Sequence, residues 1–232
     1  MTNQPRHRDA DTASHILDVA ERLAQSRGFN GFSYADIAAE LHLTKAALHY
    51  HFAGKAELGE ALIKRYSERF AAAIETLDTS GVSAPAKLEG YAKLYLDVLR
   101  DKRMCLCGML AAEYQTLPQP MRDAVIQFFD ANEAWLQRVV DQGHHEGTLR
   151  VAGSSKETAR AIVGGLEGAM LVARPYGDVT RFQAATTHLL AGLIVGPIAR
   201  DGRTEGAARP RIAMRAADRR SRGPASKPTG KH

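Results

Sequence analysis

The chain has 232 residues, of which 44% are hydrophobic and only 6% are aromatic, and its formal net charge is +5. No stretch reaches the roughly 18–20 apolar residues that a membrane span needs, and the polar first residues lack the apolar segment of a secretory signal. We therefore expect a cytoplasmic protein. Alanine and leucine are abundant and turn-rich β patterns are missing, which predicts an all-α fold.

The positive charge is concentrated at the C-terminal end. Residues 200–232 contain ten Lys or Arg and three Asp or Glu, a net charge of +7, which leaves −2 for residues 1–199. Apolar periodicity is lost over the same stretch, so we predict a basic, disordered tail. The basic balance is therefore not by itself evidence that the rest of the chain binds nucleic acid.

Helical periodicity runs through the chain after a polar arm at residues 1–10. Gly28 suits the left-handed end of a first helix, and Ser33 and Thr44 are N-cap residues for two short helices that follow. The predicted helices cover residues 11–27, 33–41, 45–52, 55–77, 88–99, 104–114, 118–143, 155–173 and 178–195.

The two short helices and their tight connection have the arrangement of a helix–turn–helix, in which the second helix enters the major groove of DNA. Leu48 and Phe52, four residues apart, are expected to face the core. This leaves lysine, histidine and tyrosine side chains on an outward arc, where they can meet phosphates or base edges, with alanines that permit close approach. We predict DNA contacts for Ser33, Tyr34, Thr44, Lys45, Ala46, Ala47, His49, Tyr50, His51 and Lys55.

Plainer interpretations compete with this one. A short basic helix on its own is more often a solvated face, and Ser33 and Tyr34 also suit capping and packing. His49 and His51 are two residues apart and point to different sides of a helix, and the two cysteines lack the CxxC form. We therefore expect neither a metal site nor a cofactor.

The segment "GFNGFSYADIAAELHLTKAALHYHFAGKAEL", residues 28–58, resembles the DNA-binding domain of the TetR/AcrR family of transcriptional repressors. The resemblance covers about residues 16–61. Position 47 is Ala where the family often has Thr or Ser, position 49 is His where Tyr is usual, and position 32 is Phe where a small polar residue is frequent. These departures weaken the expected base contact at Ala47 and phosphate contact at His49.

The resemblance implies a homodimeric repressor that binds a double-stranded, palindromic DNA operator and is released by a small-molecule effector. It implies a helix–turn–helix domain at residues 11–54 and a helical effector-binding and dimerisation domain at 55–199. Dimerisation is expected through the last two helices, at Ile162, Leu166, Met170, Leu189 and Leu193, although an intramolecular core is the competing interpretation. A pocket for a mostly apolar effector is expected among Tyr91, Tyr95, Met104, Cys105, Met109, Leu110, Tyr114, Phe128 and Trp135.

The segment "RMCLCGMLAAEY", residues 103–114, resembles one found in family members that respond to reactive electrophiles through a cysteine. A helix N-terminus beside Lys102 and Arg103 would lower the pKa of Cys105 and populate its thiolate, and Cys107 could resolve a sulfenate. A thiol-based sensor acting through Cys105 is therefore an alternative mode of control. The competing interpretation is that both cysteines are small apolar core residues.

Two other classes of function remain as alternatives. No nucleophile–base pattern, phosphate-binding glycine loop or carboxylate pair is recognisable, so we do not expect an enzyme. An enzyme with a helical nucleic-acid-binding module would have to use the cysteines or the His144–His145–Glu146 turn. A non-specific DNA-coating protein would use the basic tail and show a steep dependence of affinity on salt.

Overall fold

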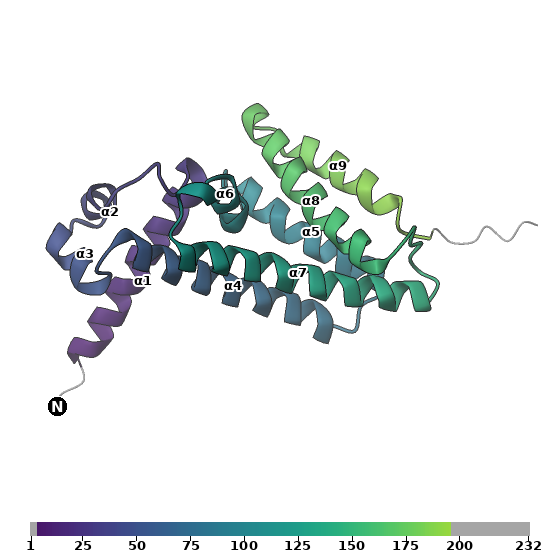
Figure 1. The fold of residues 1–232 in the computed structure, drawn as a ribbon, viewed down its shortest axis with the longest axis horizontal. Coiled ribbons are helices and arrows are strands. Elements are labelled where there is room, and N and C mark those ends of the chain that lie inside the picture. The colour runs from purple at the N-terminus through teal and green to yellow at the C-terminus, as the bar shows by residue number, and fades with distance from the viewer. Residues whose placement is uncertain (1–3, 196–232) are drawn as a thin grey trace, which may run out of the picture. The chain divides into compact units, whose positions relative to one another are not determined.

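The computed structural model describes residues 4–195 (Figure 1). In this part of the chain the predicted all-α fold is confirmed, with a single isolated β-bridge between Leu149 and Ile194. The predicted tail at 200–232 lies outside the described residues. The α-helices are α1 (Gln4–Arg27), α2 (Tyr34–Leu41), α3 (Lys45–His51), α4 (Lys55–Thr79), α5 (Ala84–Arg100), α6 (Leu106–Ala112), α7 (Gln119–His145), α8 (Ser155–Ala173) and α9 (Val179–Ala191), with short 3-10 helices η1 (Tyr114–Thr116) and η2 (Arg174–Tyr176).

Local sequence signals set the boundaries of the first helices. Gly28 follows α1 with a left-handed φ of 88°, and His42 makes the tight turn between α2 and α3 with a φ of 54°. Ser33 and Asp36 form a capping box at the start of α2, and the Thr44 side chain caps α3. These positions are the ones at which turn and capping residues were expected.

Several predicted boundaries were wrong. Helix α1 begins at Gln4, so the structure continues the first helix through most of the predicted arm at residues 1–10. The apolar stretch 104–114 gives the shorter helix α6, which starts after its N-cap Cys105 and ends at Glu113, and Tyr114 begins η1. Helix α9 stops at Ala191, after which Ile194 pairs with Leu149.

One buried layer joins the first helices to α4. The side chains of Ile16, Ile37, Leu48 and Leu58 have no solvent-exposed surface. Burying each such side chain contributes about 1.5–3 kcal/mol of hydrophobic free energy, so α3 is held against α1, α2 and the first turn of α4. The two short helices are therefore anchored on the same long helix that continues into the second half of the chain.

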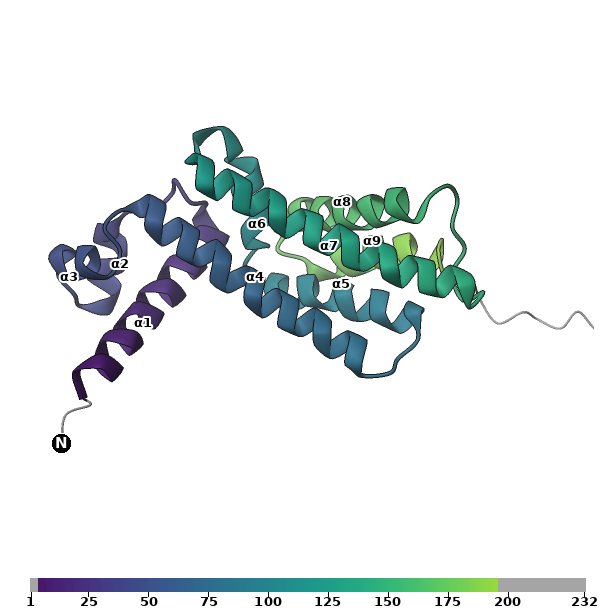
Figure 2. The ribbon, with the colours of Figure 1, turned by 60° about the horizontal axis from the view of Figure 1, so that its bottom comes forward.

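Figures 1 and 2 show α4 and α7 running side by side, with α8 and α9 packed against each other. The side chains of Leu88, Leu136, Leu166 and Phe182, one each from α5, α7, α8 and α9, are at most 1% exposed. Helices α4 to α9 thus share one apolar interior. No helix in residues 4–195 is long and apolar enough to cross a bilayer.

Candidate DNA-binding surface and regulatory site

The second helix of the helix–turn–helix, α3, is fixed by its cap and one buried side chain. The Thr44 hydroxyl accepts a hydrogen bond from the Ala47 amide over 3.1 Å, and Leu48 is fully buried. Lys45, Ala46, His49 and Tyr50 are exposed, and 75% of the Tyr50 surface is accessible. A large exposed aromatic side chain and an exposed lysine on the same helix are suited to contact a nucleic acid backbone.

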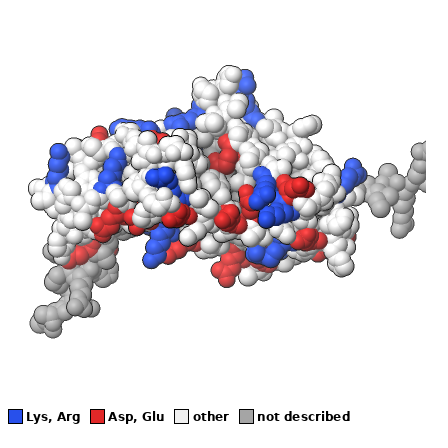
Figure 3. All heavy atoms as spheres, viewed as in Figure 1, with Lys and Arg blue, Asp and Glu red and all other residues white. Residues whose placement is uncertain are grey.

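Charge on this surface is sparse. Figure 3 shows separate Lys and Arg atoms over the end that carries α2 and α3, not a continuous blue surface. Ser33 donates hydrogen bonds from its amide and hydroxyl to Asp36, over 2.8 and 2.7 Å, and these bonds lower the pKa of the Asp36 carboxyl. The Ser33 hydroxyl is therefore engaged in the cap of α2.

Tyr34 and His49 pack together at the junction of α2, α3 and α4. The Tyr34 hydroxyl donates to the Phe52 carbonyl over 3.0 Å, and its ring centroid lies 4.8 Å from that of His49. Burial raises the pKa of Tyr34 to about 12. His49 Nδ1 lies 3.0 Å from the Ala53 carbonyl oxygen, so Nδ1 carries a hydrogen and Nε2 is the nitrogen left for an outside partner.

Lys55 was predicted to reach the DNA backbone, but the structure turns its ammonium inward. The ammonium donates a hydrogen bond to the Phe32 carbonyl and lies 4.8 and 4.5 Å from the ring centroids of Phe29 and Phe32. Burial lowers the pKa of Lys55. Lys55 therefore links the start of α4 to the turn after α1. His51, another residue predicted to contact DNA, is partly buried and packs its ring against Tyr50.

Four of the residues predicted to bind an effector form one aromatic cluster between α4, α5 and α7. The rings of Tyr91 and Trp135 stack with their centroids 5.5 Å apart. The Tyr91 hydroxyl forms a hydrogen bond with the Tyr95 hydroxyl over 3.2 Å and donates one to Asn132 Oδ1 over 3.1 Å. Phe128 joins the cluster through Phe70, 5.2 Å away. Sequence reasoning missed Phe70, although it lies one turn beyond the buried Tyr66 on the same face of α4.

A groove of about 610 Å³ opens between α4 and α7 beside this cluster. Its apolar lining includes Phe70, Ile74, Phe128 and Trp135, and its volume falls in the range of small-molecule sites. At its edge, Asp78 accepts hydrogen bonds from Trp135 Nε1 over 2.8 Å and from the Lys87 ammonium. Phe128 and Trp135 are the only predicted effector residues that line this groove, while Tyr91 and Tyr95 lie behind them in the core.

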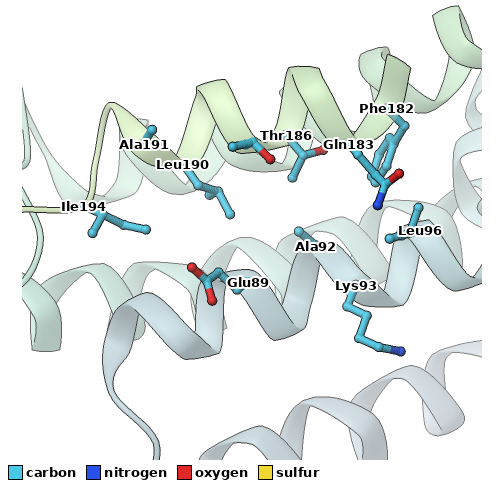
Figure 4. Close-up of a pocket in the computed structure, with 11 residues that line it drawn as sticks. Glu89, Ala92, Lys93, Leu96, Phe182, Gln183, Thr186, Leu190, Ala191 and Ile194 are labelled. Atoms are coloured by element: carbon cyan, nitrogen blue, oxygen red, sulfur yellow. The ribbon is translucent and has the colours of Figure 1, made fainter. Parts of the chain in front are cut away.

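A second groove, of about 520 Å³, lies between α5 and α9 and is shown in Figure 4. It has an apolar wall that includes Ala92, Leu96 and Leu190, with Glu89 and Lys93 contributed by α5. None of the residues predicted to bind an effector lines it.

The other predicted effector residues do not join either groove. Met104 and Leu110 are buried in the core. Met109 and Tyr114 lie at the surface of this region, where Arg174 contacts the Met109 sulfur at 3.2 Å and Arg122 lies over the Tyr114 ring. The prediction of one pocket containing all nine residues was therefore wrong, because α6 turns its apolar face into the core and not into either groove.

The structure contradicts the expectation of an activated thiolate at Cys105. Cys105 and Cys107 are 2% and 0% exposed, and burial raises the pKa of both thiols well above the usual value. The nearby Glu167 carboxyl raises them further. The Cys105 sulfur lies inside the core, 3.6 Å from the Tyr66 hydroxyl. The effect of desolvation on the thiol pKa therefore outweighs that of the helix N-terminus and of the neighbouring basic residues.

The predicted dimerisation residues of α8 also point inward. Ile162, Leu166 and Met170 are at most 1% exposed within the single chain. Leu189 of α9 packs against Gly165, where an added Cβ would lie 2.8 Å from the leucine side chain. The partly buried Leu193 packs against the same core. Ile162, Leu166 and Met170 thus belong to the core of a single chain, as the competing interpretation expected, whereas Leu189 and Leu193 are only partly buried.

Comparison with known proteins identifies the whole arrangement. A family model for the bacterial regulatory proteins of the tetR family matches residues 16–62, and one for the tetracyclin repressor-like C-terminal domain matches residues 84–189. The transcriptional regulator AcuR of Cereibacter sphaeroides is 27% identical over 172 residues, which cover 72% of this chain and 78% of AcuR.

Solved structures agree with these matches. A TetR-family transcriptional regulator from Agrobacterium tumefaciens is 30% identical, with a TM-score of 0.78 over 81% of this chain and 100% of that one. A TetR transcriptional regulator from Legionella pneumophila is also 30% identical, with a TM-score of 0.72 over 83% of this chain and 98% of that one. The fold and its helix–turn–helix define a DNA-binding transcription regulator. The chain belongs to the TetR family, as the segment at residues 28–58 indicated.

Proposed function

We propose that this regulator is a homodimeric repressor that leaves its operator when a small effector binds its C-terminal helices. The observation that carries the DNA-binding part is the α2–α3 pair. The Thr44 cap and the buried Leu48 fix α3, while Lys45 and Tyr50 are both left exposed. A helix so placed can enter a major groove while its N-terminal end favours phosphate oxygens.

Dimerisation is supported by the outward face of α8. Leu171 and Val172 are 59% and 62% exposed, and a Cβ at Gly164 or Gly168 would meet nothing within 4 Å. Small residues flanking exposed aliphatic ones allow another helix to approach closely. We propose that this face, and not the buried residues named from the sequence, forms the dimer contact, which would place two α3 helices on half-sites about one turn of DNA apart.

The effector site is best supported at the groove between α4 and α7. Phe70, Phe128 and Trp135 give it an aromatic floor suited to an apolar or aromatic molecule. One wall of the groove is α4, whose first turn packs under the DNA-binding helices. An effector that binds better when α4 and α7 are further apart would shift the population toward that conformer and away from DNA.

Fluorescence anisotropy with labelled DNA from upstream of the chain's own gene, against scrambled competitor, would test this function. Tyr50→Ala and Lys45→Ala are expected to weaken specific binding, and Lys45→Ala to reduce the dependence of log affinity on log salt by about one unit. Lys156→Ala, which removes an exposed lysine in the first turn of α8, is the matched control and should bind as the wild type does.

Equal binding of the own-promoter and scrambled DNA would exclude autoregulation, and a selection from random DNA would then be needed to find an operator. If that selection also returned no preferred sequence, the repressor proposal would be wrong and non-specific coating would remain. An effector screen by the quenching of Trp135 fluorescence would report binding in the groove, since Trp135 is the single tryptophan of the chain.

The thiol-sensor alternative has a direct test of its own. A buried, protonated Cys105 can react only after α6 opens, so we expect slow modification by a thiol reagent. If the reagent releases DNA from the wild type and equally from Cys105→Ser, control through this thiol is ruled out.

A further inference from the structure

A buried carboxyl group lies where α8 meets the start of α6. Glu167 Oε1 is buried and has no hydrogen-bond partner within the described chain. Its Oε2 approaches α6 so closely that a Cβ at position 108 would be only 2.2 Å away. Gly108 is therefore the residue that leaves room for this carboxyl in its present position, and a larger side chain there would displace the carboxyl.

The groups around Glu167 do not neutralise its charge. Tyr95 of α5 and Cys105, the N-cap of α6, are the neighbours that lower the pKa of the carboxyl, and the other ionisable neighbours are Tyr66, Tyr91 and Cys107. All five are neutral near pH 7, because burial raises the pKa of each tyrosine and thiol.

The charged residues on the other elements beside α8 have partners elsewhere or face solvent. Glu133 of α7 pairs with Arg160 over 3.1 Å, and Arg174 of η2 donates to the Ser26 carbonyl. His188 of α9 is exposed. Burial of the Glu167 carboxyl raises its pKa from 4.5 to about 7, although the neighbouring Cys105 and Tyr95 side chains lower it. The charge of Glu167 therefore changes near neutral pH.

The other end of α6 is bonded directly to the DNA-binding domain. Glu113, the residue that follows α6, accepts hydrogen bonds from the amides of Phe29 and Asn30 over 2.6 and 3.2 Å. The Asn30 side chain donates to the Thr116 hydroxyl over 2.7 Å. At the start of α6, the Met104 amide donates to the Gln25 carbonyl over 3.2 Å. A movement of α6 would therefore pull on the turn between α1 and α2.

We propose that Glu167 is a proton-binding control group that sets the position of α6 and, through Glu113, the affinity of the helix–turn–helix for DNA. The inference rests on the proposed DNA-binding function. When Glu167 is neutral, its carboxyl can stay against Gly108 without a counter-charge. When it is ionised, a buried unpaired charge favours a conformer in which α6 moves from α8 and water reaches the carboxylate.

The direction of the proton linkage follows from the raised pKa. The packed conformer holds the proton up to about pH 7, whereas a conformer with solvated Glu167 loses it near 4.5. The free energy by which proton binding favours the packed over the open conformer is therefore full below pH 4.5, falls as the pH rises, and is lost above about pH 7. Between about pH 6 and about pH 8 the ratio of packed to open conformer should fall up to ~10-fold.

The test is DNA affinity measured by anisotropy at constant ionic strength from about pH 5.5 to about pH 8. Glu167→Gln imitates the protonated group, so its dissociation constant should lie nearest to that of the wild type at the acid end. Toward the alkaline end the difference between the two should widen, by up to ~10-fold between about pH 6 and about pH 8. Glu89→Gln removes an exposed carboxylate from α5 as the matched control, and its pH profile should follow that of the wild type.

Glu113→Gln tests the transmission. In this background Glu167→Gln should change the pH profile much less than it does in the wild type, and thermal unfolding would verify that every variant folds. Parallel profiles for the wild type and Glu167→Gln overturn the control role of Glu167, and an undiminished effect in the Glu113→Gln background overturns its route. If no variant binds DNA at any pH, the proposed function itself fails.

Discussion

Replacing Thr44 by alanine removes the side-chain cap of α3, the helix that we propose enters the DNA groove. The Thr44 hydroxyl accepts a hydrogen bond from the Ala47 amide over 3.1 Å, but the same amide also lies 3.1 Å from the Thr44 carbonyl oxygen. N-caps contribute about 0.5–2 kcal/mol. Because Ala47 keeps its carbonyl acceptor in the variant, we expect the lower part of that range, about 0.5–1 kcal/mol.

This loss of stability should make α3 itself less ordered. The helix has seven residues, far fewer than a helix needs for stability in isolation. A loss of about 0.5–1 kcal/mol corresponds to a ~2–5-fold fall in DNA affinity if the frayed helix does not bind. Urea unfolding would measure the stability change and anisotropy would measure the affinity, with Thr44→Ser as the control that keeps the hydroxyl.

Two results would refute this reasoning. If Thr44→Ser is as weak as Thr44→Ala, the methyl group matters and the cap does not. If Thr44→Ala keeps the unfolding free energy of the wild type but loses affinity, the hydroxyl acts on DNA directly and not through the stability of α3.

Three further variants test other parts of the molecule. Tyr91→Phe removes the hydroxyl that donates to Asn132 Oδ1 in the core, so the free energy of unfolding should fall by about 1–3 kcal/mol; an unchanged urea midpoint would contradict this. Val172→Glu puts a charge on the proposed dimer face, and light scattering should then show monomers, whereas an intact dimer would place the interface elsewhere. Glu167→Gln should stabilise the fold relative to the wild type as the pH rises from 4.5 to about 7, by at most about 3 kcal/mol. A stability difference that did not change with pH would mean that the Glu167 pKa is not raised.

The helix–turn–helix could be predicted from the sequence because its signals are local. Ser33 and Thr44 mark two helix starts and Gly28 marks a helix end. Leu48 and Phe52, four residues apart, have the spacing of a buried helix face. Each of these signals spans fewer than about five residues, so they need no knowledge of the remaining fold. The predicted exposure of Lys45 and Tyr50 follows from the same pattern.

The regulatory half could not be predicted in this way, since its contacts join distant segments. The periodicity of Ile162 and Met170 shows that one face of α8 is buried, but it does not say whether the cover is the same chain or a second copy. The environment of Cys105 also depends on distant residues. The neighbouring Lys102 and Arg103 suggested a thiolate, whereas Glu167 and Met170, more than sixty residues away in the sequence, complete the burial of the thiol. Lys55 faces inward because the turn after α1 brings Phe29 and Phe32 beneath it.

The two halves of the molecule approach each other closely at Gly59 of α4. A Cβ there would lie 2.5 Å from the Met121 sulfur in the first turn of α7 and 2.9 Å from the Phe29 ring in the turn after α1. Phe70, which lines the groove, lies eleven residues further along the same helix, a distance of about 16 Å. Because α4 is continuous between these points, an effector that separates α4 from α7 at Phe70 would tilt the helix about its tight contact at Gly59. That tilt would reach the DNA-binding helices through Phe29, on the same turn to which Glu113 attaches α6. Control by an effector in the groove and control by a proton on Glu167 would thus act on one and the same turn.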